Sequence, residues 1–279
     1  MKRQRELSAL VAIPAVLGIL WFAPPWAFGS LVAFLALATL SEFYRLAERS
    51  GIPVPKSLAL LIAGAILAAA VVPAPSPSGL TVAGGLSAAA ALFAVALMAA
   101  GIPVERALSG TAATTLGIPM VVFPCCAMIW LDRAALGGAS DRFGPRLIIF
   151  LLVTIWGCDS FAYYVGRAFG RHKLAPSISP KKTIEGSIGG LVGSVGVAAA
   201  AAAIFLPEFR PVEAAVVGGL ASTAGQIGDL VESMFKRGAG VKDSGHFLPG
   251  HGGFYDRVDS LLFAAPVLCG AVLVKMAVL

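Results

Sequence analysis

Apolar segments of about 20 residues fill most of this 279-residue chain, and each is long enough to cross a bilayer as a helix. The mean hydropathy is +0.86, and 13% of the residues are charged. Nine segments qualify: about 8–23, 26–46, 57–73, 80–100, 111–131, 147–168, 184–206, 212–235 and 258–277. The first and the third are the shortest, so eight is the lower count. We expect an all-α, polytopic membrane protein with about nine transmembrane helices.

The connections between these segments are too short for a separate soluble domain. We therefore expect one integral membrane domain over residues 1–279, with N-terminal transmembrane helices in 1–140 and the charged loops in 141–279. The basic start of the chain, followed by an apolar run, also resembles a signal peptide. Because the small-residue cleavage pattern is poor and more spans follow, an uncleaved first helix is the preferred interpretation.

Lys and Arg residues are distributed unevenly among the connections. If the N-terminus is cytoplasmic, 16 of the 21 Lys and Arg residues fall on the cytoplasmic side and five on the other. Cytoplasmic loops of membrane proteins carry such an excess. We therefore predict a multi-pass protein of the cell (inner) membrane, with its N-terminus and charged loops in the cytoplasm. Because the basic residues follow membrane topology, nucleic-acid binding is not expected.

The stretch from Ser233 to Asp259 interrupts the apolar pattern. It holds four Lys or Arg residues, three carboxylates, two histidines and a Gly-Gly step. Lys and Arg suit phosphate oxygens, and Asp side chains suit a hard cation such as magnesium. Outside the ends of apolar helices, this composition indicates phosphate chemistry at a membrane surface.

Carboxylates also occur inside predicted spans. Asp159 lies several turns from either end of its segment, where a charge is costly and by default marks a functional site. In the segment 212–235 and just beyond, one arc of roughly 100° of a helix holds four polar side chains: Asp229, Glu232, Ser233 and Lys236. A structural ion pair is the alternative for Asp159, and an amphipathic helix end is the alternative for Lys236. Asp229 lies about two turns deeper and favours a polar cavity.

The predicted helix 184–206 begins after Lys181 and Lys182. The free N–H groups of a helix N-terminus bind phosphate readily, and the two lysines add charge there. The same helix opens with glycine pairs at small-xxx-small spacing, Gly186/Gly190 and Gly189/Gly193. We expect these pairs to pack within the chain, and a dimer interface is the alternative.

The last predicted helix begins after a second glycine-rich connection. Gly252 and Gly253 let the backbone approach a ligand closely. Asp256 and Asp259 follow with i, i+3 spacing, so both carboxylates can face one point.

The stretch from Ser233 to Asp259 resembles the signature of the phosphatidate cytidylyltransferase, or CDP-diacylglycerol synthase, family. That signature runs Ser-x-apolar-Lys-Arg, four residues, Lys-Asp-x-small, two residues, apolar-Pro-x-His-Gly-Gly-apolar-x-Asp-Arg-apolar-Asp. Every fixed position matches: Ser233, Phe235, Lys236, Arg237, Lys242, Asp243, Gly245, Leu248, Pro249, His251, Gly252, Gly253, Phe254, Asp256, Arg257, Val258 and Asp259. The likeness extends upstream to residues 159–163, 166–167, 179–186 and 228–229. The first 140 residues resemble the family mainly in their hydrophobic spans.

The resemblance implies a membrane enzyme that joins CTP to phosphatidate, giving CDP-diacylglycerol and pyrophosphate. It implies magnesium as the cofactor, with room for a second cation, and a homodimer whose active site opens to the cytoplasm and the lipid bilayer. Residues 141–279 would then be the catalytic region.

The resemblance also implies roles for individual residues. Metal binding would fall to Asp229 and Asp256, with Asp259 as a third ligand or as a residue behind the ligands. The catalytic residues would be Asp229, Asp256 and the phosphate-contacting Lys236, Arg237, Lys242 and Arg257. Substrate binding would involve Asp159, Lys181, Lys182, Ser233, Asp243, His251, Gly252 and Gly253.

Three other functions remain open on the sequence. A cytidylyltransferase for another lipid phosphate, such as an isoprenoid one, would use the same reaction. An ion or solute transporter would use Asp159 and Asp229 on a translocation path, but it predicts dispersed charge and an internal repeat. A structural scaffold leaves the Gly-Gly-x-x-Asp-Arg motif unexplained.

Overall fold

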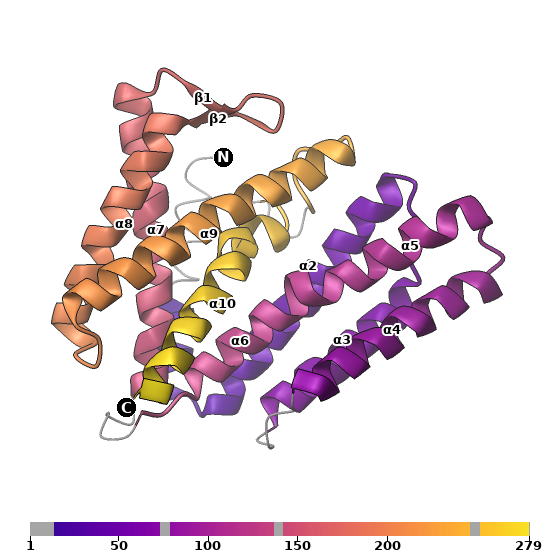
Figure 1. Ribbon diagram of the computed structural model, residues 1–279, viewed down its shortest axis with the longest axis horizontal. Coiled ribbons are helices and arrows are strands. Elements are labelled where there is room, and N and C mark those ends of the chain that lie inside the picture. Colours follow the sequence, from indigo (N-terminus) through magenta and orange to yellow (C-terminus); the bar gives the residue numbers. More distant parts are fainter. Residues whose placement is uncertain (1–13, 73–78, 137–141, 246–251, 279) are drawn as a thin grey trace.

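The computed structural model describes residues 14–72, 79–136, 142–245 and 252–278, and this part of the chain is predominantly helical (Figure 1). The first half contains Pro25–Arg49 (α2), Lys56–Val71 (α3), Gly79–Ala99 (α4), Val104–Gly117 (α5), the π-helical turn Ile118–Val122 (η1) and Phe123–Asp132 (α6). The second half contains Phe143–Phe169 (α7), the strands Lys173–Ala175 (β1) and Ser179–Thr183 (β2), Ile184–Phe205 (α8), Pro211–Gly238 (α9) and Tyr255–Val278 (α10).

Six helices of the described residues are long and apolar enough to cross a membrane: α2 from Trp26, the continuous run Val104–Asp132, α7, α8, α9 and α10. Two further apolar helices, Lys56–Val71 and Gly85–Ala99, are shorter. The first predicted span, 8–23, lies partly outside the described residues. The chain is therefore a helical protein with several membrane-spanning candidates, as predicted from its hydropathy.

The fifth predicted span, 111–131, begins earlier in the structure than in the sequence analysis. Helix starts at Val104 and includes Glu105 and Arg106, which hydropathy alone had excluded. Pro119 lies within this run and has no backbone N–H to donate. The helix widens there into the π turn η1, which keeps α5 and α6 in one continuous span.

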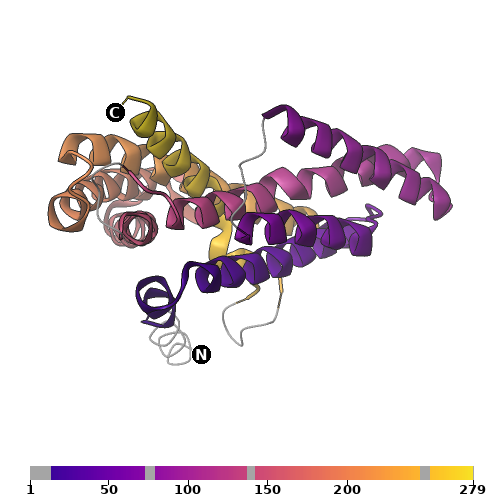
Figure 2. The ribbon, with the colours of Figure 1, turned by 90° about the horizontal axis from the view of Figure 1, so that it is seen from below.

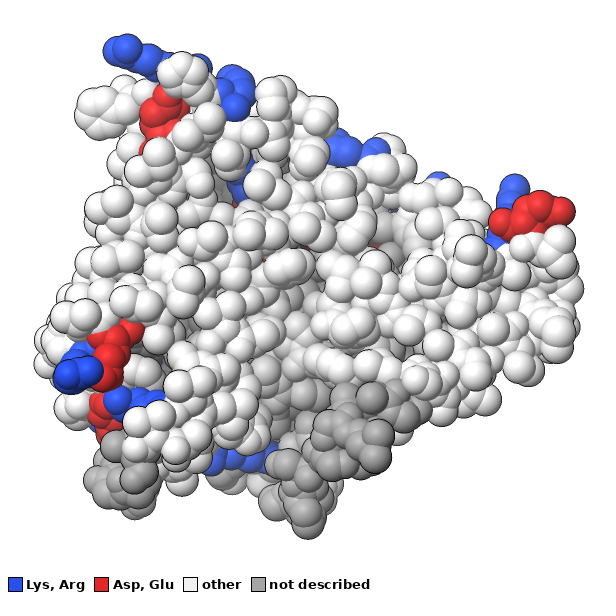
Figure 3. Space-filling view, in the orientation of Figure 1, with Lys and Arg blue, Asp and Glu red and all other residues white. Residues whose placement is uncertain are grey.

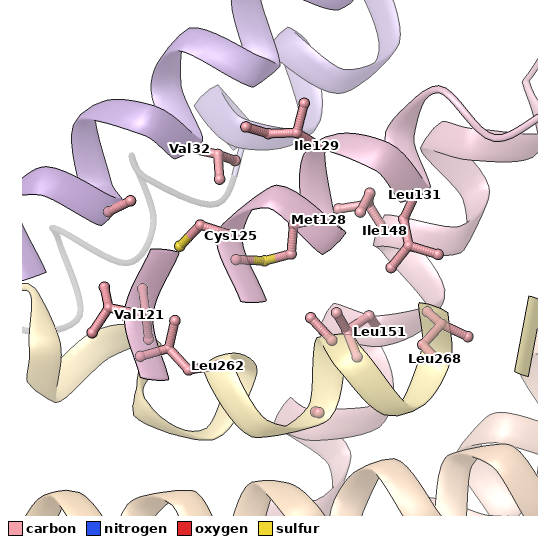
Figure 4. Close-up of a cluster of buried hydrophobic side chains, with 14 of the residues drawn as sticks. Val32, Val121, Cys125, Met128, Ile129, Leu131, Ile148, Leu151, Leu262 and Leu268 are labelled. Atoms are coloured by element: carbon pink, nitrogen blue, oxygen red, sulfur yellow. The ribbon is translucent and has the colours of Figure 1, made fainter. Parts of the chain in front are cut away.

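A buried apolar cluster holds the two halves of the chain together, with α6 at its centre (Figure 4). Cys125, Met128 and Ile129 of α6 lie among side chains of α2, α7 and α10. Val32 of α2 and Leu262 of α10 belong to the same cluster. Burying these side chains positions the start of α10 against α2.

The last four helices pack in sequence order: α8 packs against α7, α9 packs against α8, and α10 packs against α9. Figure 1 shows α7 and α8 at one side of the molecule and α3, α4 and α5 at the other, with α9 and α10 between them. The view from below shows the same separation (Figure 2).

Glycines allow α7 and α8 to approach closely. A Cβ on Gly190 would lie 2.9 Å from the backbone oxygen of Cys158, and one on Gly186 would lie 2.8 Å from that of Ala162. Such contacts are too short for any larger residue. The expectation that the glycine pairs of this helix pack within the chain is confirmed.

The strands β1 and β2 form a short antiparallel hairpin that the all-α prediction did not include. The hairpin leads directly into α8, and Thr183 accepts a hydrogen bond from the Gly186 N–H, 3.2 Å away, as the N-cap residue. The hairpin carries Lys181 and Lys182 immediately before this helix start.

Charged side chains on the face shown in Figure 3 gather near its upper and lower margins, and a broad band between them is almost free of charge. A band of this kind is what a lipid-facing surface requires.

Candidate active site

A close approach of α9 and α10 brings acidic residues of the two helices together. A Cβ on Gly228 would lie 2.7 Å from the backbone oxygen of Asp259, so only glycine permits this spacing. Asp229 follows Gly228 directly. The packing of the two helices therefore places the Asp229 and Asp259 carboxylates side by side.

Glu232 completes a group of three carboxylates with Asp229 and Asp259. One ligand oxygen from each lies within 4.8 Å of the others. Glu232 stands one turn after Asp229 on α9, so both point to the same side of the helix. Carboxylate oxygens at this spacing are the ligands that magnesium and calcium prefer.

The Glu232 side chain is fully buried, at 0% exposure. Its Oε2 lies 2.5 Å from Lys236 Nζ, without the alignment of a hydrogen bond. Its Oε1 has no hydrogen-bond partner within the described part of the chain. A buried carboxylate oxygen without a partner is costly, and a bound cation would remove that cost.

Lys236 connects this group to Asp256. Its Nζ lies 2.6 Å from Asp256 Oδ1 and 2.5 Å from Glu232 Oε2. The lysine side chain is 11% exposed, so its charge is held mainly by these two carboxylates. A substrate phosphate at this position would have to replace one of them.

The Asp256 carboxylate accepts hydrogen bonds from residues just before α10 and from Ser244. Its Oδ2 accepts hydrogen bonds from the backbone N–H groups of Ser244 (2.9 Å) and Gly253 (2.8 Å), and lies 2.8 Å from the Ser244 hydroxyl. Gly252 has a φ of 77°, which favours glycine, and a Cβ there would lie 2.6 Å from Asp256 Oδ2. The structure thus places Asp256 beside the group of three and not within it.

On the other side of the group, the hairpin brings a cation to Asp229. Lys182 forms an ion pair with Asp229, joining β2 to α9. Asp159 of α7 also lies near this group. Its charge interacts with those of Asp229, Lys182 and Asp259. The linked cluster therefore contains five carboxylates and two lysines.

The remaining predicted residues lie around this cluster. Arg237 is exposed and donates to the backbone oxygens of Ile178 (3.2 Å) and Val241 (3.0 Å), which ties the hairpin turn to the end of α9. Ser233 is buried, whereas Lys181, Lys242, Asp243 and Arg257 are exposed. His251 lies outside the described residues.

Sequence reasoning did not place Glu232 in the group of three carboxylates or Ser244 in contact with Asp256. Glu232 was placed on the polar arc of its helix but was given no part in metal binding, although its i, i+3 spacing from Asp229 was a usable signal. Ser244 falls on an unspecified position of the motif, and nothing in the sequence distinguishes it.

Comparisons with known proteins identify the family of this chain. The sequence matches the profile of the Cytidylyltransferase family over residues 3–274. It is 31% identical to a phosphatidate cytidylyltransferase of Synechocystis over 100% of this chain and 99% of that protein. It is 44% identical to the phosphatidate cytidylyltransferase of Bacillus subtilis over 128 residues, and 47% identical to that of Staphylococcus haemolyticus over 132 residues. These two matches span about half the length of each relative, 48% and 50%. With a match across nearly its whole length, the chain belongs to the cytidylyltransferase family.

Proposed function

We propose that this protein is a CTP:phosphatidate cytidylyltransferase, which transfers CMP from CTP to phosphatidate and releases pyrophosphate. The family membership and the names of the relatives support the reaction class and the lipid substrate. The observation that carries the proposal is the group of Asp229, Glu232 and Asp259 next to Lys182 and Lys236. A transferase of this type must hold two polyanionic substrates together, and such a cluster provides both cation ligands and fixed positive charge.

Magnesium fits the residues present. Asp229, Glu232 and Asp259 would hold it, because their oxygens converge and Glu232 Oε1 has no partner among the residues described. When bound, magnesium supplies positive charge and Lewis acidity to nucleotide phosphates. Five carboxylates against two lysines in the linked cluster leave room for a second cation.

The proposed transfer needs little acid–base chemistry from the protein. An oxygen of the phosphatidate phosphate attacks the α-phosphorus of CTP, the new P–O bond forms, and the bond to the β-phosphate oxygen breaks. The attacking phosphate is already an anion at neutral pH, so no strong general base is required. Positioning and charge neutralisation would supply most of the rate, as in phosphoryl transfer generally.

The cluster and its surroundings divide these tasks. Lys182 holds Asp229, and Lys236 holds Glu232 and Asp256, so the lysines fix the carboxylates in place. Lys181, Lys242 and Arg257 are exposed and would contact phosphate oxygens, as would Arg237 at the end of α9. Asp159 would line the substrate site from α7.

We also propose that the active site faces the cytoplasm and that nine helices span the cell membrane. The connections at 50–55, 100–103, 170–183 and 239–245 lie at one end of the helices in Figure 1, and the connection at 206–210 lies at the other. This alternation agrees with the excess of Lys and Arg assigned to the cytoplasmic side. A homodimer in the bilayer belongs to the same proposal and follows from the family resemblance.

The test is a direct assay on the purified full-length protein in lipid vesicles. Phosphatidate, magnesium and CTP labelled at the α-phosphate should give a labelled lipid and unlabelled pyrophosphate. Omission of magnesium or of phosphatidate should abolish the labelled lipid.

A panel of lipid phosphates distinguishes the related enzymes. Equal or faster labelling of an isoprenoid phosphate would replace the substrate proposal while leaving the reaction intact. No labelled lipid with any lipid phosphate, together with uptake of solute by the vesicles, would indicate a transporter.

A further inference from the structure

A buried carboxylate from the first half of the chain contacts the residues on either side of the last loop, Ser244–Gly245 and Gly253–Tyr255, which are called the active-site segment below. Glu42 lies on α2, more than 180 residues before the motif that resembles the family signature, and it is 1% exposed. A carboxylate buried in an apolar helix is costly unless its oxygens are hydrogen-bonded. The position of its partners therefore shows what the residue does.

Within the described residues, the Glu42 carboxylate accepts two hydrogen bonds, and both come from the segment around the start of α10, from Ser244 and Tyr255. Its Oε2 accepts from the backbone N–H of Tyr255, 2.9 Å away, and lies 2.8 Å from the Ser244 hydroxyl. Tyr255 is the first residue of α10, so its N–H is one of those without an intrahelical partner and lies at the positive end of the helix dipole. Glu42 thus stabilises the start of the helix that carries Asp256 and Asp259.

The neighbouring Arg45 does not account for this burial. Its guanidinium lies 3.9 Å from Glu42 Oε1, and the arginine side chain is 51% exposed. Ion pairs of that kind contribute little.

The glycines of the segment are fitted to the Glu42 carboxylate. A Cβ on Gly253 would collide with Glu42 Oε2 and with the Ser244 hydroxyl, and a Cβ on Gly245 would collide with Glu42 Oε1. The second glycine of the Gly-Gly step is therefore required by a carboxylate from α2, not by a bound ligand alone.

A continuous chain of polar contacts leads from Glu42 to the carboxylate group. The Ser244 hydroxyl lies 2.8 Å from Glu42 Oε2 and 2.8 Å from Asp256 Oδ2, and its single proton serves one of them at a time. Asp256 contacts Lys236, and Lys236 contacts Glu232. Glu42 is thereby connected to the proposed metal ligands through side chains that are all largely buried.

This junction is closely packed on the side of Gly245 and Gly253 but not on the side of the α2 surface. A cavity of about 320 Å³ lies between α2 and the segment 243–245, and Glu42 and Ser244 are among its lining residues. On the side of the cavity, the contacts of the segment with α2 include the hydrogen bonds to Glu42 and a ring contact of Phe34 with Phe254 at 5.8 Å.

We propose that Glu42 is a positioning residue for the transfer reaction: it anchors Ser244 and the start of α10 so that Asp256 and Asp259 are correctly placed. This inference rests on the proposed function for its kinetic consequences. It assigns a role to the N-terminal helices, which supply a fixed acceptor for the active-site segment.

The test compares Glu42→Leu with Glu42→Gln in the purified full-length protein. Leucine removes both hydrogen bonds, and a misplaced site should lower kcat roughly 100-fold with a smaller change in the KM for CTP. The glutamine amide oxygen can still accept from Tyr255 and Ser244, so Glu42→Gln should recover at least roughly ten-fold of that loss.

Two variants of the same helix serve as controls. Tyr44→Phe removes a buried hydrogen bond to Thr114 O (2.8 Å) that points away from the site, and Glu48→Gln changes an exposed carboxylate. Tyr44→Phe should lower the Tm without a comparable loss of kcat, and Glu48→Gln should change neither. Equal kcat losses in Glu42→Leu and Tyr44→Phe at matched Tm would overturn the positioning role.

Amide hydrogen exchange separates this inference from the proposed function. In Glu42→Leu, the peptide that carries Gly253 and Tyr255 should exchange faster, whereas peptides of α7 and α8 should not change. Unchanged exchange at Tyr255 would overturn the anchor even in an active enzyme. If the wild type transfers no CMP, the proposed function fails, and the exchange result still decides whether Glu42 holds the segment.

Discussion

At the scale of single residues, the site is defined by five carboxylates that two lysines, Lys182 and Lys236, neutralise only in part. Glu232 is fully buried, and its Oε1 has no hydrogen-bond partner in the described segments. Asp229 and Asp259 bring two more carboxylates within 4.8 Å. Mutual repulsion of three carboxylates in an apolar surrounding disfavours the folded state. A divalent cation between them would remove that repulsion.

The first prediction separates the two sets of metal ligands that the sequence and the structure suggest. Glu232→Gln and Asp259→Asn should each weaken Mn²⁺ binding to the purified protein by about 10- to 100-fold and raise the Mg²⁺ concentration for half-maximal activity similarly. Asp256→Asn should lower turnover with little effect on metal affinity, because Asp256 holds Lys236 and Gly253.

Glu208→Gln is the matched control, since it removes a paired carboxylate that contacts Arg146 far from the site. It should leave metal affinity unchanged. If Asp256→Asn weakens Mn²⁺ binding as much as Asp259→Asn does, and Glu232→Gln leaves it unchanged, the ligand set is Asp229, Asp256 and Asp259, and Glu232 is not a ligand.

At the scale of secondary-structure elements, the site depends on how closely α9 and α10 pack. Gly228 faces the backbone of Asp259 and the ring of Phe263, and no side chain fits between the helices at that point. The hairpin β1–β2 adds Lys182 from the opposite side. The two helices therefore set the spacing of the carboxylates, and the hairpin supplies a counter-charge.

The second prediction concerns that helix spacing. Gly228→Ala forces a methyl group against the Asp259 backbone oxygen, and overpacking of this kind typically costs about 1–3 kcal/mol. We expect a lower Tm and a large loss of transfer activity, measured on the same preparation.

Gly238→Ala tests the same change at the last residue of α9, where an added Cβ meets nothing within 4 Å. Alanine favours helix over glycine by about 1 kcal/mol, so this variant should be as stable as the wild type or slightly more so. A Gly228→Ala protein with wild-type Tm and turnover would show that the close approach of the helices is not needed.

At the scale of the whole molecule, the helices form an apolar body with charged ends. The charge-poor band in Figure 3 and the six long apolar helices found among the described residues both fit a bilayer. The carboxylate cluster lies toward the end of α9 and the start of α10, on the side where the hairpin and the end of α2 also lie (Figure 1).

The third prediction tests the orientation of the molecule. Ser50→Cys and Pro207→Cys place exposed thiols at opposite ends, after α2 and between α8 and α9. A maleimide that does not cross membranes should label Pro207→Cys in intact cells and should label Ser50→Cys only after permeabilisation. The reverse result would place the carboxylate cluster on the outer side and contradict the proposed access of CTP.

Much of the fold was predictable because a lipid-embedded chain has few choices. Backbone polar groups must be satisfied within the bilayer, so long apolar segments become helices. Gly186 and Gly190 were correctly expected to pack within the chain. The hairpin at 173–183 was missed because its strands are three and five residues long and lack an apolar face. The early start of α5 was missed because Glu105 and Arg106 lower its hydropathy.

The sequence by itself determined that the chain is helical, that it suits a bilayer, and which segment holds the polar residues of the family. Only the tertiary structure decided which of those residues act together. Spacing along one helix allows Asp256 and Asp259 to face the same point. In the structure, however, Asp256 accepts hydrogen bonds from Lys236 and Gly253, whereas Asp259 lies with Glu232 in the group of three carboxylates. Spacing also gives no sign of Glu42, because its partners lie more than 200 residues away in the chain. Contacts between distant segments depend on helix packing, and local sequence patterns do not encode that packing.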